Sequence, residues 1–514
     1  MARVVFRCDA SPAIGGGHVA RCMALAHALR RRGAEVELIT RDLPARVRTL
    51  LVEPGGYVVR DLPAPDAGEV AAPDPGQPLA HADWLSVPQS TDAAQTIQAL
   101  GTAKRADWLI VDHYALDARW ERAVRPFADK LLVIDDLADR DHVCDALLDQ
   151  NFFLAPESRY TQRVPPHAER MLGPKFALLR EEFGAGRARV GERTGALRRI
   201  FVCFGGFDGA SQTLRTLIAI EAAALDDIAV DVVIGSDHVE RRQIEALCAS
   251  KPAHRAHLDA SNVAELMVPA DLAIGASGIM NWERAALGLP AIVASVAENQ
   301  HIVARDLTID RACIYLGLAH EWSADTLAAW LRALRGTPTL MRALAARAAE
   351  LTDGHGARRV AARLLPLPID LRRATAADSE SILAWRNAEE SRRYSVNTEA
   401  IAPEQHATWF TRVVDAPHVA LLVGEHAGSP VGVLRYDVDS ASAVVSVYLV
   451  PGRHGQGFGP ALLHAGTRWL REHHPGVKQV SAEIRHDNTA SLEAFANAGY
   501  QVNRSIYTLD VRHE

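Results

Sequence analysis

The sequence predicts an α/β protein with two doubly wound, Rossmann-type units followed by a mixed α/β module. Short apolar runs alternate with helical patterns up to about residue 365, and a second set of such runs begins near residue 198. The pattern changes at the proline pair Pro366 and Pro368. A chain of 514 residues is also too long for one core. We therefore expect domains over residues 1–165, 166–365 and 369–514.

In the first unit, apolar runs of strand length are separated by stretches of helical periodicity. The expected strands are residues 4–6, 36–39, 108–111 and 131–134, and the expected helices are 18–32, 91–103 and 118–128. This alternation predicts a parallel sheet built from βαβ units. The proline-rich stretch over residues 62–82 interrupts it and predicts a long surface loop.

The second unit repeats the pattern. Its expected strands are residues 200–204, 230–234, 272–274 and 291–293, and its expected helices are 210–224, 238–250, 280–288 and 324–350. Two doubly wound units in tandem leave a cleft between them, and ligands usually bind in such clefts.

The last module has a different order of elements. Helices are expected near residues 376–391 and 403–415, before strands over 419–424, 430–438 and 443–450. A helix over 457–473, a strand over 478–485, a helix over 489–498 and a closing strand over 501–511 follow. The module has the size of one domain.

Composition narrows the class of protein. The chain is 48% hydrophobic and 23% charged, with a net charge of −7 and no long basic run, so we do not expect nucleic acid as a partner. No run approaches the ~20 apolar residues that cross a bilayer, and we expect neither a membrane partner nor a signal peptide. The six scattered cysteines have no metal-ligand or redox spacing, which fits a reducing compartment. We expect a cytoplasmic enzyme or binding protein.

The most informative motif is IGGGH over residues 14–18, between an expected strand and an expected helix. Its glycines allow a tight turn and let a ligand approach the main chain, which makes Gly17 a candidate binding residue. The turn delivers His18 to the first helical turn, where the helix dipole disfavours imidazolium. A neutral imidazole suits a general base near pH 7. The alternative is a strand-to-helix turn with an incidental histidine.

Polar loops follow several expected strands of the second unit. The loop FGGFD over residues 204–208 precedes a helix whose N-terminus can hold a phosphate, and GSD over 235–237 ends the next strand in the same way. Glu283 lies in the first turn of another helix, where it can accept hydrogen bonds from a ribose diol or serve only the helix dipole. Together these loops predict a nucleotide-sugar site. Its candidate residues are Gly205, Gly206, Ser277, Gly278, Glu283, Asn299 and Gln300.

Several ordered blocks of the first 365 or so residues match one family. The blocks run from FR at 6–7 to GH at 17–18, then VDHY at 111–114, IDDLA at 134–138, LDQN at 148–151, WER at 282–284, LGLP at 287–290 and AENQ at 297–300. This region resembles the UDP-2,4-diacetamido-2,4,6-trideoxy-β-L-altropyranose hydrolases of pseudaminic acid synthesis. The resemblance implies a GT-B fold related to the MurG glycosyltransferase. It also implies that UDP lies mainly on the second unit, with the sugar facing the first.

The same resemblance implies hydrolysis of a glycosyl-phosphate bond, in which water attacks the anomeric carbon, the C–O bond breaks and the configuration inverts. His18 would be the base or the group that orients this water, Glu283 would hold uridine, and Asn151 would contact the sugar. Asp112 or His113 would contact and orient these groups without touching the substrate, although strand-end hydrogen bonding is the favoured interpretation of His113. The family implies no divalent metal. Phe207 departs from the small hydroxyl residue usual at its position, which affects one phosphate contact.

The third module carries a second anion-binding motif, RHGQGFG over residues 453–459, between a strand-like run and a helix. With NTASLEAFANAGY over residues 488–500, it resembles the GNAT acetyltransferase superfamily over about 369–511. WRN at 385–387, Tyr394, and WF at 409–410 are similar to members that act on nucleotide-linked amino sugars. The resemblance implies acetyl-CoA as co-substrate and no tightly bound cofactor. The implied acetyl-CoA-binding residues are Leu449, Val450, His454, Gly455, Gln456, Gly457, Phe458, Gly459 and Asn488.

Two positions depart from this superfamily. His454 stands where Gln or Arg is usual, and Phe495 stands where many members carry the tyrosine that protonates the leaving thiolate. Tyr448 and Tyr500 are therefore candidates for the general acid, with structural roles as the alternative. Glu483 can relay the amine proton through water or be an exposed strand carboxylate.

The two modules predict consecutive reactions on a UDP-linked amino sugar. We expect acetyl-CoA-dependent N4-acetylation of a UDP-linked altrosamine, followed by hydrolysis that releases UDP from the diacetamido product. One alternative is a glycosyltransferase with an acceptor hydroxyl in place of water. Others are a sugar-nucleotide sensor with a CoA-binding module and a related hydrolase for a different sugar stereoisomer.

Overall fold

The computed structural model describes residues 1–64, 79–101, 104–205, 208, 211–395, 398–485 and 487–500. It contains two compact units, Met1–Leu364 and Leu365–Glu514. Within the described ranges, no helix has both the length and the apolar character needed to cross a membrane.

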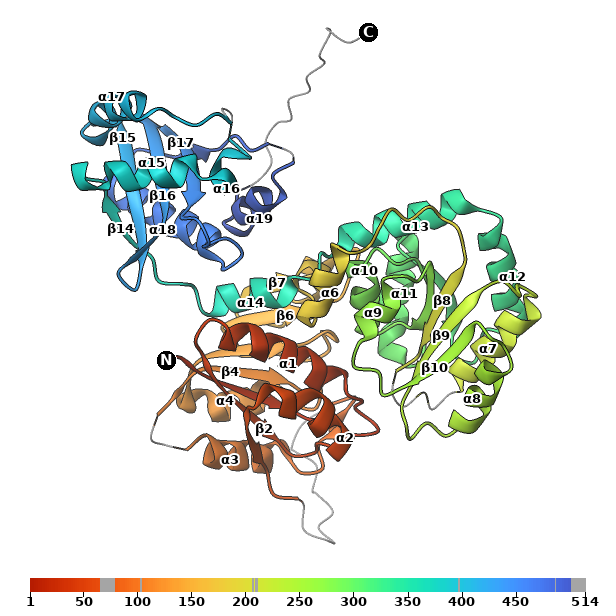
Figure 1. The fold of residues 1–514 in the computed structure, drawn as a ribbon. Coiled ribbons are helices and arrows are strands. Elements are labelled where there is room, and N and C mark those ends of the chain that lie inside the picture. Colours follow the sequence, from red (N-terminus) through yellow and green to blue (C-terminus); the bar gives the residue numbers. More distant parts are fainter. Residues whose placement is uncertain are drawn as a thin grey trace, which may run out of the picture. The chain divides into compact units, whose positions relative to one another are not determined.

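The first unit begins with a seven-stranded parallel sheet in the order β3-β2-β1-β4-β5-β6-β7 (Figure 1). Its strands are β1 Arg3–Cys8, β2 Glu35–Thr40, β3 Val58–Asp61, β4 Ala106–Asp112, β5 Ala128–Ile134, β6 Ala146–Asp149 and β7 Glu169–Leu172. The helices of this region are α1 Gly17–Arg30, α2 Ala45–Val47, α3 Gln89–Leu100, α4 Ala118–Val124 and α5 Pro156–Arg159. The strand order reverses between β1 and β4, which pair with Cys8 opposite Asp112. Ligands of doubly wound sheets bind at such a switch point.

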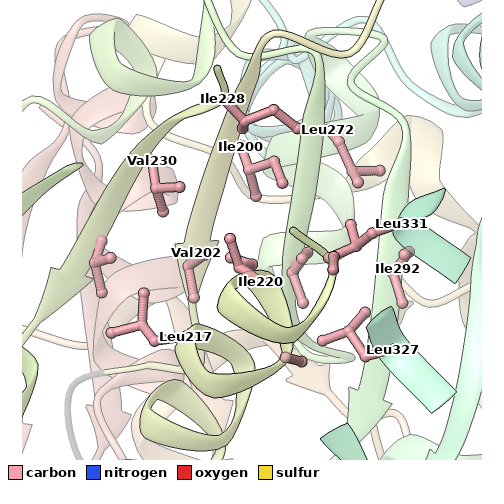
Figure 2. Packing of buried hydrophobic residues seen from close by; sticks show 14 of the residues in the cluster. Ile200, Val202, Leu217, Ile220, Ile228, Val230, Leu272, Ile292, Leu327 and Leu331 are labelled. Atoms are coloured by element: carbon pink, nitrogen blue, oxygen red, sulfur yellow. The ribbon is translucent and has the colours of Figure 1, made fainter. Parts of the chain in front are cut away.

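A second parallel sheet follows in the order β10-β9-β8-β11-β12-β13. Its strands are β8 Arg199–Cys203, β9 Ala229–Ile234, β10 His254–Leu258, β11 Leu272–Ala276, β12 Ala291–Ser295 and β13 Ile314–Leu318. Its helices are α6 Glu181–Arg187, α7 Gln212–Ala222, α8 Arg241–Ala249, α9 Val263–Met267, α10 Met280–Ala286, α11 Glu298–Ile309, α12 Ala324–Arg335 and α13 Pro338–Leu351. Figure 2 shows aliphatic side chains of β8 packed against Leu217 and Ile220 of α7 and Leu327 and Leu331 of α12.

The last helix of this unit returns to the first sheet. This helix, α14 Gly356–Leu364, packs on α1. The indole Nε1 of Trp108 on β4 donates to the carbonyl oxygen of Leu364 at 2.9 Å. The end of the unit is thereby fixed to β4 and to α1, the helix that carries His18.

The second unit has a five-stranded mixed sheet in the order β14-β15-β16-β17-β18. Its strands are β14 Asp370–Arg373, β15 Val419–His426, β16 Ser429–Asp439, β17 Ser442–Leu449 and β18 Gln479–Ser481, and its helices are α15 Ser379–Asn387, α16 Glu389–Arg392, α17 Pro403–Val414, α18 Phe458–His473 and α19 Thr489–Asn497. Of the described strand pairs in this sheet, only β17–β18 is parallel, and it is registered from Ser442 to Val444. The later part of β17 therefore separates from β18.

The predicted class, two parallel doubly wound sheets followed by a mixed α/β module, is confirmed. The single helix expected over 324–350 is wrong, because the chain forms α12 and α13. Pro338 at the start of α13 has no N–H to continue α12 and suits a helical first turn. The helix expected over 118–128 ends at Val124, before Pro126. The closing strand expected over 501–511 and most of the loop expected over 62–82 lie outside the described residues.

Candidate active sites

The IGGGH turn brings His18 to the switch point of the first sheet. Gly15 has φ +77°, a conformation that glycine adopts without strain. A Cβ atom placed on Gly15 or Gly17 would meet no heavy atom within 4 Å, so the main chain here faces open space. The helix α1 begins at Gly17, and His18 is the second residue of its first turn.

Asp112, the last residue of β4, orients the His18 ring. The Nδ1 atom of His18 lies 2.6 Å from Oδ1 of Asp112. Arg21, one turn later on α1, donates to Oδ2 from Nε at 2.6 Å and to Oδ1 from Nη2 at 2.7 Å. Burial raises the pKa of a carboxyl group, but here Arg21 and His18 outweigh burial and hold the pKa of Asp112 well below its ordinary value. An ionised Asp112 accepts a hydrogen bond from Nδ1–H, so Nε2 is the ring nitrogen that can act as a base.

Aromatic side chains surround the His18 ring. The ring of Tyr114 lies edge-on to it, with centroids 4.6 Å apart. Trp84 stacks on Tyr114 at 5.3 Å, and His81 lies 4.4 Å from Trp84. Trp84 and His81 are only partly buried, so this aromatic wall (His81, Trp84 and Tyr114) has an accessible edge beside the histidine.

The predicted sugar-contact residue, Asn151, already has protein partners. It follows β6, and its Nδ2 donates to Oδ2 of Asp136 at 3.1 Å. Its Oδ1 accepts from the indole Nε1 of Trp282 on α10 at 3.1 Å. The side-chain oxygen of Asn151 thus joins the two sheets of the first unit, and a sugar contact would use the second Nδ2 hydrogen.

His113, next to Asp112, has a different environment. Its Nδ1 accepts from the main-chain N–H of Ala115 at 3.1 Å, and its Nε2 lies 3.3 Å from Oδ2 of Asp9. Asp9 also accepts from the buried Arg7 at 2.6 Å. These contacts agree with the favoured interpretation of His113 as a strand-end group.

The loop after β11 and the start of α11 meet in the second half of the unit. A Cβ atom on Gly278 would lie 3.6 Å from Nε2 of Gln300, whose Oε1 accepts from the N–H of Val296 at 3.1 Å. The Oγ of Ser277 accepts from Nδ2 of Asn281 at 3.0 Å. The candidate residues Ser277, Gly278 and Gln300 therefore lie together, whereas the side chain of Asn299 lies outside the described part of the structure.

Glu283, the candidate uridine ligand, is largely buried on α10. Its carboxylate Oε1 lies 3.8 Å from Nη2 of Arg180. Burial raises the pKa of Glu283, and the nearby Glu182 adds to this shift. Arg180 is its ion-pair partner at 3.8 Å, which leaves this carboxyl group free lone pairs for a neutral hydrogen-bonding ligand such as a diol.

The loop after β8 has free space around Gly205, and its Asp208 caps the N-terminus of α7. Gly205 has φ +97°, and a Cβ there would meet nothing within 4 Å. Gly206 and Phe207 lie outside the described residues. Asp208 accepts from the N–H groups of Gln212 at 3.1 Å and Thr213 at 2.8 Å. This carboxylate therefore occupies two first-turn amides of α7 that were expected to be available to a phosphate.

The loop between β17 and α18 has the conformation of an anion-binding turn. Gly452, Gly455 and Gly457 have φ values of +76°, +73° and +85°, and α18 begins directly afterwards at Phe458. Gln456 donates from Nε2 to the carbonyl oxygen of Gly452 at 2.8 Å, which ties the turn together. Gly459 lets α18 approach α19, since a Cβ there would lie 3.4 Å from Cβ of Ala494.

An acidic side chain lies on this loop. Oε2 of Glu390, on α16, is 2.9 Å from Nδ1 of His454 and accepts from the N–H of Gly452 at 3.4 Å. Both side chains are about half exposed. A carboxylate therefore occupies part of the loop that was predicted to hold a pyrophosphate.

The two predicted main-chain contacts on β17 differ in their availability. The N–H of Val450 donates to the carbonyl oxygen of Val431 at 3.0 Å. Because donors alternate sides along an antiparallel strand, the N–H of Leu449 points away from β16, to the side where β18 pairs only as far as Val444. Leu449 is the better placed of the two to offer an amide to a ligand.

The acid and base candidates of this module are not equivalent. Burial raises the pKa of Tyr448 and of Tyr500, so both phenols keep their proton at neutral pH. Tyr500 packs edge-on against Phe495, with centroids 4.9 Å apart. Glu483 is exposed. Asn488 accepts at Oδ1 from the N–H of Ser491 at 3.1 Å, which leaves its Nδ2 as the group for a ligand.

Several residues beside His18 were not predicted as site residues: Arg21, Asp136, His81 and Trp84. A signal exists for two of them. Arg21 is three residues after His18 and shares its helix face, and Asp136 follows the end of a strand. His81 and Trp84 lie at the end of the proline-rich part of the sequence, and no periodicity marks them.

Comparisons with known proteins agree with this division. Residues 369–501 match the family model of the acetyltransferase (GNAT) domain. The chain is 25% identical over 281 residues to the UDP-2,4-diacetamido-2,4,6-trideoxy-β-L-altropyranose hydrolase of Campylobacter jejuni, covering 54% of this chain and 86% of that protein. It is also 21% identical over 511 residues to the uncharacterized protein MJ1062 of Methanocaldococcus jannaschii, covering 96% of this chain and 95% of the relative.

Among solved structures, the UDP complex of Arabidopsis thaliana UGT89C1 covers 71% of this chain and all of its own, with a TM-score of 0.50 and 13% identity. This likeness shows that the first unit has a GT-B-like fold. The chain thus joins a region homologous to a UDP-sugar hydrolase to a C-terminal GNAT acetyltransferase domain.

Proposed function

We propose that the chain is a bifunctional enzyme of pseudaminic acid synthesis. Its GNAT domain transfers an acetyl group from acetyl-CoA to the 4-amino group of a UDP-linked altrosamine. Its first unit then hydrolyses UDP-2,4-diacetamido-2,4,6-trideoxy-β-L-altropyranose to UDP and the free sugar. The observation that carries the proposal is the His18–Asp112 pair at the switch point of a region homologous to such a hydrolase.

In the hydrolytic step, Nε2 of His18 takes a proton from water as the water oxygen bonds to the anomeric carbon. The bond between this carbon and the phosphate oxygen breaks, and UDP leaves with the electron pair. Asp112 stabilises the imidazolium that forms, and Arg21 keeps Asp112 ionised. UDP is a good leaving group, so main-chain amides and helix dipoles suffice to stabilise its charge. Attack from the face opposite UDP inverts the configuration.

The residues around His18 favour a sugar substrate. The aromatic wall of His81, Trp84 and Tyr114 offers an apolar edge, which suits the methyl group of a 6-deoxy sugar or of an acetamido group. Asn151 and Glu283 remain the proposed contacts for the sugar and the uridine. Gly17, Gly205, Ser277, Gly278 and Gln300 are the proposed contacts of the nucleotide-sugar on the loops.

In the acetyl transfer, the amine nitrogen attacks the thioester carbonyl and loses one proton, which Glu483 is proposed to accept through water. The C–S bond then breaks, and the CoA thiolate takes a proton. The amides of residues 452–459 are proposed to hold the pyrophosphate, and the N–H of Leu449 to polarise the carbonyl. Tyr448 and Tyr500 are the proposed donors to the thiolate, because both keep their proton at neutral pH.

The first test is incubation of the purified chain with the UDP-diacetamido sugar and no acceptor. Equal amounts of UDP and free sugar are expected, with an inverted anomer in the first NMR spectra. Release that needs an acceptor would instead indicate a glycosyltransferase. A panel of UDP-amino sugars would identify the preferred stereoisomer.

The second test uses variants on one helix. His18→Ala should abolish UDP release and leave acetyl transfer intact. His27→Ala, an exposed position on the same helix, is the matched control and should leave both activities intact. Unchanged UDP release in His18→Ala would remove the histidine from its proposed role. Thiol release from acetyl-CoA in the presence of the UDP-amino sugar measures the other activity, and its absence would favour a module that only binds CoA.

A further inference from the structure

An unbroken series of hydrogen bonds connects the helix α10 to the His18 ring. We call this series the bridge. Its links are Trp282 Nε1 to Asn151 Oδ1 at 3.1 Å, Asn151 Nδ2 to Asp136 Oδ2 at 3.1 Å, Arg21 Nη1 to Asp136 Oδ2 at 3.0 Å, Arg21 Nη2 to Asp112 Oδ1 at 2.7 Å, and Asp112 Oδ1 to His18 Nδ1 at 2.6 Å. It joins five separate segments of the chain.

His18, Arg21, Asp112 and Trp282 are buried, and Asp136 and Asn151 are partly buried, so water has little access to most of these contacts. Trp282 and Asp112 have no exposed surface, and the side chains of Arg21 and Asp136 are 5% and 9% exposed. Tyr114 also donates from its hydroxyl to Oδ1 of Asp136. A buried polar group that loses its partner is costly, so each link constrains the next one.

The chemistry of each group sets the direction of every link. An indole N–H can only donate, so Asn151 must present its oxygen to Trp282 and its NH₂ group to Asp136. A guanidinium can only donate and an ionised carboxylate can only accept. Asp112 therefore accepts from Nδ1 of His18 at 2.6 Å, and the longer contact between Nη2 of Arg21 and Nδ1, at 3.3 Å, competes only weakly with that bond.

We propose that Arg21, Asp136 and Trp282 are positioning residues that set the tautomer of His18. Through Asn151, they make the availability of Nε2 as a base depend on the position of α10. This inference rests on the proposed hydrolase function. Because α10 also carries Glu283, the proposed uridine contact, the bridge links the helix that binds the nucleotide to the base that activates water.

The decisive variant is Trp282→Phe, which keeps an aromatic ring and removes the Nε1 donor. The expected result is a fall in kcat for UDP release of about tenfold, equivalent to about 1.4 kcal/mol. KM and the Kd for UDP should stay within a factor of two, because the Glu283 backbone position does not depend on the indole N–H. Equal kcat values for Trp282→Phe and wild type would overturn the proposal.

The chain offers a matched control in Trp322→Phe. Trp322 is also buried in the second half of the first unit, but its Nε1 has no hydrogen-bond partner within the described structure. This variant should keep the wild-type kcat. If both variants lose the same activity, the effect of Trp282 is one of packing, and the proposal fails.

A readout without substrate separates this inference from the proposed function. The ¹⁵N NMR signals of His18, assigned by their absence in His18→Ala, should show a protonated Nδ1 in the wild type. Arg21→Met should shift the population toward a protonated Nε2, and Arg21→Lys should restore part of the original tautomer. An unchanged tautomer in Arg21→Met refutes the bridge even if UDP release is observed. The expected shifts in a protein that releases no UDP would support the bridge and count against the hydrolase.

Discussion

Replacement of Asp112 by asparagine tests the proposed hydrolytic base most directly. The carboxylate accepts one hydrogen bond from His18 and two from Arg21. A carboxamide has a single acceptor oxygen, and the guanidinium, which can only donate, should hold that oxygen. The NH₂ group then faces Nδ1 of His18, which must accept, and the ring proton moves to Nε2. The proposed base is thereby lost while the side-chain volume is kept.

The Asp112 carboxylate orients the catalytic histidine in the proposed reaction and pairs with Arg21 in the folded protein, so its replacement should lower both kcat and stability. General base catalysis contributes roughly 10²–10⁴-fold, so kcat for UDP release should fall by about 10³-fold with little change in KM. Breaking a buried ion pair costs about 3–5 kcal/mol. Because Arg21 keeps its bond to Asp136 in this variant, we expect the loss of stability to be near the lower value. Acetyl transfer by the same preparation should be unchanged.

A matched control separates catalysis from a general Asp→Asn effect. Asp129 on β5 is exposed and pairs with an exposed Arg105, so Asp129→Asn should alter neither kcat nor the unfolding temperature. UDP release is followed by chromatography, and stability by thermal unfolding. A folded Asp112→Asn protein with kcat within threefold of the wild type would refute the reasoning, because His18 would then act without an anionic partner.

Three further predictions follow from other parts of the chain. Gly457→Val should raise KM for acetyl-CoA at least tenfold and leave hydrolysis intact, because φ +85° is strained for a branched side chain. Thiol release measures this KM, and loss of both activities would contradict the prediction. Glu390→Gln should strengthen acetyl-CoA binding about two- to fivefold in calorimetry, because it removes a negative charge beside His454 and Gly452. Weaker binding would count against the loop over residues 452–459 as the pyrophosphate site. Burial and the neighbouring Asp136 raise the pKa of Asp149 to about 8. The folded state therefore holds this proton more tightly than the unfolded chain. The free energy of unfolding should fall between about pH 4 and pH 8 by up to about 1.4 kcal/mol per pH unit. Asp149→Asn should flatten that slope in denaturant titrations, and an unchanged slope would exclude this carboxyl group as its source.

The layout of the sheets could be predicted because buried parallel strands leave a clear mark on a sequence. Runs such as residues 108–111 and 131–134 are apolar throughout, and helical patterns separate them. Weaker elements left no such mark. The strand β10 reads HRAHL and is half exposed, and the strand β7 is short and mostly exposed. Their positions follow from parallel pairing with the buried strands β9 and β6.

The candidate site was predictable only where chemistry and local pattern coincide. His18 follows a glycine-rich turn, so its placement at the start of a helix is visible in the sequence. The partnership of Arg21 with Asp112 and Asp136 is not visible, because these residues are 91 and 115 positions apart. They meet only because β4 pairs with β1 and β5 pairs with β4. Strand order, which a single sequence does not encode locally, brings them together.

The distribution of buried charge in the first unit agrees with the proposed bond cleavage. Around His18, the carboxylates of Asp112 and Asp136 outnumber the guanidinium of Arg21, so this region favours positive charge. Near Ser277 the balance is reversed. Arg284 is buried and donates to the carbonyl oxygen of Ala276 at 2.8 Å, with no carboxylate at ion-pair distance among the described residues.

Heterolysis of a glycosyl-phosphate bond needs this separation of charge. Burial lowers the pKa of Arg284 to about 10, which still leaves it protonated at neutral pH. The anomeric carbon and the imidazolium of His18 become positive as the bond breaks, whereas the departing diphosphate becomes more negative. In the proposed cleavage, the carboxylates of Asp112 and Asp136 near His18 and the guanidinium of Arg284 on α10 would stabilise both changes without reorganisation. In the proposed cleavage, the same arrangement would repel a diphosphate from the His18 side and so favour binding of the nucleotide-sugar with its sugar toward His18.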